Sequence, residues 1–182
     1  MARIDLSPLC EGRKYIGVDR DIKDVDRVWG VALAVSTKLL LLARCVDFHL
    51  DGYVIIRRND IARICCGRSE RVFERILKNE GILENVTAPA YLELESWPTV
   101  FRSLRTMRRM AIVEGEDPEL DEFIIGRIER IGKKSVRLRH FSVTGYWEDK
   151  PSVAPYEDIT LVSFDSEYIS VFGRYVRERK AR

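Results

Sequence analysis

Residues 123–172, FIIGRIERIGKKSVRLRHFSVTGYWEDKPSVAPYEDITLVSFDSEYISVF, decide the fold predicted for this chain. Within them, residues 135–141 alternate apolar and basic side chains, which is typical of a strand with one face in water. Residues 123–132 have isoleucines three apart, a helical period, but two glycines disfavour a helix. We therefore expect a sharply bent strand with a bulge near Gly126, and another strand that opens at Asp158 and Ile159.

A weaker copy of the same plan lies upstream, in residues 30–73. The positions that recur in one order are Gly30 and Gly126, Leu40 and Val136, Leu42 and Leu138, and Asp60 and Asp158. The first three pairs are 96 residues apart and the last pair 98 apart, which one two-residue insertion explains. Chance similarity between two ordinary β-segments is the alternative. We predict an internal repeat.

The predicted fold class is mainly β with short helices, an α+β class, built as two tandem small barrels. Helices are expected at residues 71–81 and 96–107, where apolar side chains recur at helical spacing. The predicted division of the chain is a solvated lead-in at 1–27, a first barrel unit with a C-terminal helix at 28–84, a linker at 85–95, and a second barrel unit with an N-terminal helix at 96–182.

Four consecutive leucines, residues 39–42, do not alternate with polar residues. A strand that is apolar on both sides is buried on both sides. This strand is therefore expected to be covered either by the second unit or by another subunit. Asp51-Gly52, just downstream, is a turn signal.

Composition excludes several classes of protein. The 182 residues are 46% apolar and 33% charged, with a formal net charge of +2, so the chain lacks the strong basic field of many nucleic-acid-binding proteins. No apolar stretch approaches the length of a membrane span, and charges with a proline replace the apolar core of a signal peptide. We expect a cytoplasmic protein with no membrane association.

No catalytic motif is recognisable, and no cofactor or metal is predicted. The four cysteines include no CxxC pair and the chain has two histidines, so a zinc site is poorly supported. Asp60 and Asp158 occupy the same place in two units, so a turn-capping role fits them better than an acid–base pair. His140 shares the inward face of its strand and fits a hydrogen-bonded core histidine.

Basic residues supply the remaining functional signal. The candidate nucleic-acid-binding residues are Arg57, Arg58, Arg68, Arg127, Lys133, Lys134, Arg137, Arg139 and Trp147. They could follow a phosphate backbone, with Tyr146 and Trp147 stacking on bases. The alternative is a set of solvated surfaces balanced by the acidic segment 114–122.

The order of elements around residues 113–114, 124–128 and 135–141 resembles the Sm-like small β-barrel family. That resemblance implies a five-stranded barrel, assembly into rings by edge-strand pairing, and RNA binding in many members. Those members use an aspartate–asparagine pair and an arginine–glycine–asparagine-like turn. This chain departs from both, because its nearest turn is Cys66-Gly67-Arg68-Ser69 and the second copy has Phe164-Asp165-Ser166.

The sequence thus predicts a non-enzymatic interaction module that self-associates or binds a protein partner. The alternative is single-stranded RNA or DNA binding through the basic hairpin and loop residues. An enzyme is a third hypothesis, which a buried polar pocket holding His140 with an acid would favour.

Overall fold

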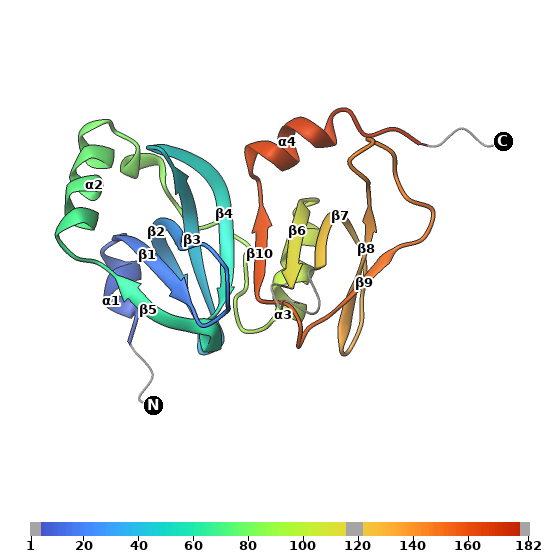
Figure 1. Ribbon diagram of the computed structural model, residues 1–182, viewed down its shortest axis with the longest axis horizontal. Helices are drawn as coiled ribbons and strands as arrows, with labels where there is room; N and C mark the ends of the chain where they lie inside the picture. The colour runs from blue at the N-terminus through green and yellow to red at the C-terminus, as the bar shows by residue number, and fades with distance from the viewer. Residues whose placement is uncertain (1–4, 116–121, 179–182) are drawn as a thin grey trace.

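A computed structural model describes residues 5–115 and 122–178. The strands in chain order are β1 (Tyr15–Arg20), β2 (Val28–Val35), β3 (Leu39–Val46), β4 (His49–Arg57), β5 (Ile61–Cys65), β6 (Met110–Gly115), β7 (Glu122–Ile131), β8 (Ser135–His140), β9 (Ser152–Pro155) and β10 (Leu161–Phe164). They form one antiparallel sheet in the order β5-β1-β2-β3-β4-β10-β6-β7-β8-β9 (Figure 1). The predicted class, mainly β with short helices, is confirmed.

The prediction of two closed barrels is wrong, because the ten strands form a single open sheet. β10 explains the difference. It pairs with β6 on one side and with β4 on the other, through four residue pairs in each case. The edge of β4 is therefore occupied by the second half of the chain. Figure 1 shows the two lobes joined where β4 and β10 lie side by side.

Both halves of the sheet use the same strand order. In each half the last strand pairs with the first, and the second, third and fourth strands follow. Gly30 and Gly126 lie in the second strand of their halves, and a Cβ on either would meet a backbone carbonyl oxygen of the third strand, at 2.4 Å and 2.0 Å. The ladder is irregular at Leu33 and at Glu129, three residues after each glycine. The bulge in β7 is thus at Glu129 and not at Gly126.

The prediction that residues 39–42 are buried on both faces is confirmed, since none of the four leucines is more than 2% exposed. Leu39 and Leu41 belong to the main core, which also contains Phe101 and side chains of β6 to β10. Leu40 and Leu42 face the interior of the first half. The second half of the same chain covers one side, so this strand requires no partner subunit.

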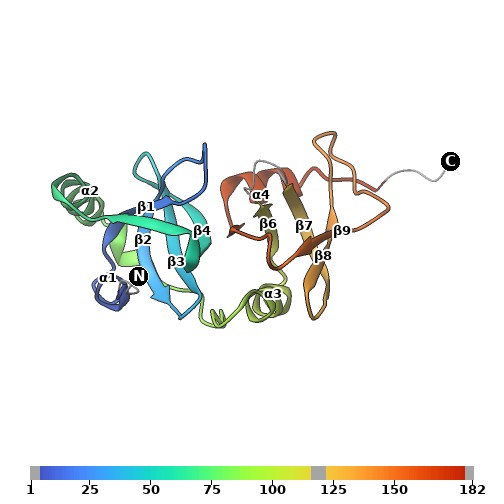
Figure 2. The same cartoon turned by 60° about the horizontal axis from the view of Figure 1, so that its bottom comes forward.

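In the described part of the chain, four α-helices lie against the sheet: α1 (Ser7–Glu11), α2 (Arg68–Asn79), α3 (Trp97–Thr106) and α4 (Glu167–Gly173). The predicted helices at 71–81 and 96–107 are confirmed as α2 and α3. Proline in the first turn of α3 is tolerated because the N–H groups of that turn have no acceptor within the helix, so the missing N–H of proline removes no hydrogen bond. Figure 2 shows the segment between α2 and α3 crossing below the sheet from one lobe to the other.

Two further local predictions differ from the structure. Residues 1–27 were expected to be a solvated lead-in, but they contain α1 and the buried strand β1. Asp51-Gly52 is not a hairpin turn, because β4 runs through it and the turn lies at Asp47 and Phe48. Gly52 has φ +68° there, and a Cβ would meet the Phe164 carbonyl oxygen at 2.4 Å. The Asp-Gly pair thus marks a position of positive φ inside β4, where the chain passes close to the end of β10.

No helix in residues 5–115 and 122–178 is long and apolar enough to cross a membrane.

Candidate functional site

The arginines predicted in the first half do not converge on one site. Arg57 donates through Nε to the Asp60 carboxylate at 2.8 Å and 2.9 Å, and its guanidinium also reaches the Glu157 carbonyl oxygen. Arg58 donates to the Ser36 carbonyl oxygen at 2.7 Å. Both side chains thus hold loops together. Arg68 is exposed at the start of α2.

Asp60 and Asp158 each precede the last strand of their half. Asp60 ends a single turn of 3-10 helix and accepts the hydrogen bonds of Arg57. Asp158 lies in the turn before β10, where its backbone N–H donates to the Pro155 carbonyl oxygen at 3.2 Å. The carboxylate contact of Asp60 fits the predicted turn-capping role, whereas the contact of Asp158 involves only its backbone.

The β7–β8 hairpin and the segment that follows it bring three of the predicted residues together. Trp147 lies close to two guanidinium groups, with Arg127 at 4.8 Å and Arg139 at 5.2 Å from the centre of its ring. Phe141 contacts the same indole edge-on at 5.5 Å between ring centres. A cation over an aromatic face is attracted by about 0.5–1 kcal/mol, and more when water is excluded. Trp147 is only 5% exposed, so it orders the arginines and offers no open face for a base.

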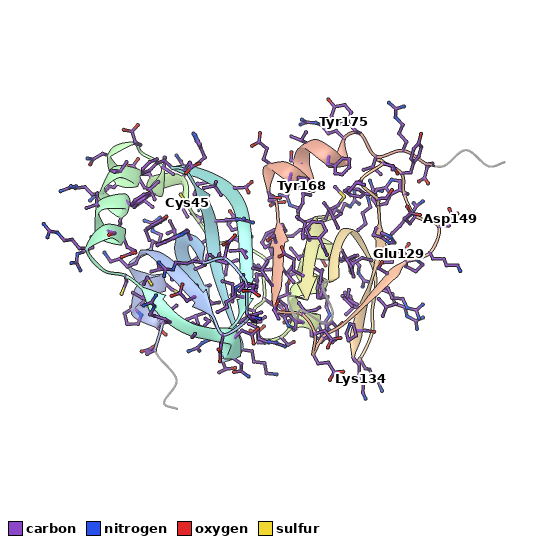
Figure 3. All side chains as sticks on the ribbon, viewed as in Figure 1. Cys45, Glu129, Lys134, Asp149, Tyr168 and Tyr175 are labelled. Carbon is purple, nitrogen blue, oxygen red and sulfur yellow. The ribbon has the colours of Figure 1, made fainter. Side chains whose placement is uncertain are left out.

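Arg137 is exposed on β8, two residues before Arg139, and lies directly opposite Arg130 of β7. Arg130 was not among the predicted residues. The signal that could have found it is the run of basic side chains at alternate positions of β8. The outward residues of the neighbouring strand lie directly opposite these side chains, and Arg130 is one of those residues. Lys133 and Lys134 are exposed in the tight turn between the two strands, and Figure 3 shows Lys134 at its tip.

His140 is half-buried at the end of β8, and its Nδ1 lies 3.0 Å from the Ser152 hydroxyl oxygen of β9. This contact ties the last two strands of the sheet together. It supports the prediction of a hydrogen-bonded histidine on the inward face.

An ion cluster that the sequence did not suggest lies at the other end of the sheet. Asp19 of β1 accepts hydrogen bonds from Arg27 and from Arg63, the latter pair at 2.7 Å. The hydrogen bond from Arg27, joined by that from Arg63, lowers the pKa of Asp19 to about 2. Arg27 also covers the ring of Trp29 at 5.0 Å. This cluster fixes the start of β2 against β1 and β5.

A cleft of about 660 Å³ extends from Trp29 and Phe73 to Glu114 of β6. Burial raises the pKa of Glu114, although the nearby guanidinium groups of Arg20 and Arg44 oppose that rise. His140 is not among the residues that line it. This cleft is therefore not the pocket of His140 and an acid that would favour an enzyme.

Among the described residues, no group of three or more histidine, cysteine or acidic side chains is arranged to hold a metal ion. The acidic segment 114–122, expected as an exposed loop, lies largely outside them, because only its ends belong to β6 and β7.

Comparison of the chain with models of protein families, with curated proteins and with solved structures finds no match.

Proposed function

We propose that this protein is a non-enzymatic interaction module that assembles with copies of itself through the two free edges of its sheet. The observation that carries the proposal is the pairing of β4 with β10. It joins the fourth strand of one half to the last strand of the other. The two strands left at the ends of the sheet are the remaining last strand, β5, and the remaining fourth strand, β9.

The same offset of 98 residues that aligns Asp60 with Asp158 defines an intermolecular register. Within the chain, Ile55 of β4 lies opposite Val162 of β10. Transferring that pair to the free edges places Val153 of one copy opposite Ile64 of the next. Such a head-to-tail contact closes into a ring or continues as a filament, depending on the rotation between copies.

The β9 edge is accessible among the described residues. Val153 of β9 is 43% exposed. The Tyr156 N–H donates to the Lys134 carbonyl oxygen at 2.9 Å, and strand backbones alternate, so the N–H and C=O of Val153 face away from β8. Unpaired edge groups of this kind are a ready template for another strand.

We further propose that the halves are tandem copies of an Sm-like unit that share one sheet instead of closing separately. Three observations support this: the common strand order, the equivalent glycines, and the bulges three residues after each of them. Edge pairing between copies would then repeat the joint already made inside the chain.

Multi-angle light scattering of the full chain at tens of micromolar tests the assembly. We expect a mass above that of one chain, which falls to the monomer in Val153→Lys, since a charged edge residue opposes strand addition. Val143→Lys is the matched control, because Val143 is 86% exposed in a loop outside the edges. A strictly monomeric wild-type protein, or an oligomer that Val153→Lys leaves intact, contradicts edge assembly.

A further inference from the structure

The outer face of the β7–β8 hairpin carries four arginines in two directly opposed pairs, Arg127 with Arg139 and Arg130 with Arg137. Arg127, Arg130 and Arg137 are exposed and Arg139 is half-buried. Ile128 and Leu138 point to the other face and lie in the main core. The arginine face, as we call these four residues, is therefore held in place by a rigid, packed hairpin.

Like charges directly opposite each other weaken an antiparallel pair of strands. The described residues relieve this only in part. Arg139 forms an ion pair with Glu178 at 2.6 Å, while Arg127, Arg130 and Arg137 form none with a described residue. We call the two opposed pairs, Arg127 with Arg139 and Arg130 with Arg137, the two rows of the arginine face. Glu129 is exposed at the bulge between these rows, and Figure 3 labels it part-way along the hairpin. An anion that bridges opposed guanidiniums would turn the repulsion into attraction.

Trp147 fixes the geometry of one row. Its ring lies near the guanidiniums of Arg127 and Arg139. Both groups thus have an apolar body beneath them, which limits their rotamers. The planar guanidinium matches phosphate through two parallel N–H bonds, so ordering it before binding reduces the entropy lost on binding.

The surroundings of the arginine face extend the positive track. Lys133 and Lys134 lie at one end, at the turn, and the exposed Arg177 lies beyond the other, bridged by its backbone to Tyr146. The rows are about 7 Å apart, since Arg137 and Arg139 are two strand residues apart. Tyr146 comes directly before Trp147 in the sequence and is 40% exposed, so its side chain is accessible to a ligand.

We propose that the arginine face binds the phosphate backbone of a single-stranded nucleic acid, and that Tyr146 stacks on an unpaired base. Sequence-independent binders combine a basic track with aromatic faces in this way. The inference does not depend on edge assembly, because the side chains involved project from the face of the sheet and not from its edges.

The test is a fluorescence-anisotropy titration of the full chain with a labelled oligothymidylate of about 20 nucleotides, longer than the site of one small domain. With about four phosphates contacted, the slope of log K against log salt concentration should be close to −3. Arg130→Gln with Arg137→Gln removes two contacts, so we expect the slope to fall to about −1.5 and the affinity at low salt to fall at least about tenfold.

Arg75→Gln with Lys78→Gln is the matched control, since both residues are exposed on α2 and the change in net charge is the same. We expect it to bind as the wild-type chain does. Tyr146→Ala should weaken binding by about fivefold or more at unchanged slope, because stacking is neutral. Circular dichroism shows whether each variant is folded.

Several results overturn the proposal: no binding at low salt, an equal loss in the α2 control, or binding of inorganic polyphosphate as tight as that of the oligonucleotide with no effect of Tyr146→Ala. Arginine-dependent capture of the chain by phosphatidylserine vesicles without oligonucleotide binding also overturns it, in favour of a membrane surface. Duplex DNA bound more tightly than the single strand counts against the stacking role and against the proposal.

Discussion

Replacing Gly126 with alanine tests how closely β7 approaches β8. The added Cβ would stand 2.0 Å from the Arg139 carbonyl oxygen, against about 3.4 Å for an ordinary contact. That oxygen belongs to the backbone and cannot rotate away, so the strands must separate by about 1.4 Å at this point. Overpacking costs about 1–3 kcal/mol, and weakened ladder hydrogen bonds bring the expected loss in free energy of unfolding to about 3–4 kcal/mol.

For a chain of this size, each kcal/mol shifts the midpoint of thermal unfolding by about 2–4 °C, so we expect a fall of about 6–16 °C. Urea unfolding followed by circular dichroism measures the free energy directly. Gly30→Ala should behave alike, since its Cβ would lie 2.4 Å from the Ala43 carbonyl oxygen.

Gly12→Ala is the control, because its Cβ would meet the flexible end of Lys14 and the Pro8 carbonyl oxygen, both at 3.2 Å. We expect a loss below about 1 kcal/mol there. A Gly126→Ala protein that unfolds within about 0.5 kcal/mol of the wild type would refute the argument from close approach.

Three further outcomes are expected. Leu41→Ala should lower the free energy of unfolding by about 2–5 kcal/mol, because Leu41 is fully buried between the two halves; a loss under about 1 kcal/mol in a urea titration would contradict that packing. The lowered pKa of Asp19 contributes stability that is present above pH 4 and is lost as the pH falls towards 2. Asp19→Asn should therefore lower the free energy of unfolding by roughly 1–2 kcal/mol at neutral pH and reduce its further fall between pH 4 and pH 2. An unchanged fall in that range would rule out the pair with Arg27 as its cause. Ser166→Ala should cost about 1 kcal/mol, since its hydroxyl accepts from the Ile169 N–H at 3.3 Å, and Ser166→Asp should restore most of the loss in the same measurement if capping is the reason.

Local pattern was enough to predict most strands. The unbroken leucines of β3 indicated burial on both faces, and the alternation in β8 indicated one wet face. Gly126 was correctly placed in a strand, since two glycines outweighed the helical spacing of the isoleucines. These signals act within a few residues, and the structure changes none of them.

Pairing between distant strands could not be predicted in the same way. Each half could satisfy its own edge by closing, and nothing in the sequence of β10 states that its second edge meets β4. β1 was missed because its apolar residues are few and are flanked by charges. α4 was also missed, although Ser166 followed by Glu167 and by apolar residues three apart is a helix-start signal.

The candidate site shows the same limit. The sequence selected Arg57 and Arg127 on equal grounds, as basic hairpin and loop residues. Only tertiary contacts separate them, because Arg57 bonds to Asp60 and to a backbone carbonyl while Arg127 lies over Trp147 on an exposed face. Which charges are already neutralised depends on neighbours that are distant in sequence.

The position of β10 has a consequence for how the protein is made. Residues 161–164 follow both of their partner strands in the sequence, yet they lie between them in the centre of the sheet. During synthesis, the edges of β4 and β6 that pair with β10 must therefore stay unpaired until residues 161–164 have left the ribosome. Until then, these two exposed strand edges need protection from pairing with other nascent chains.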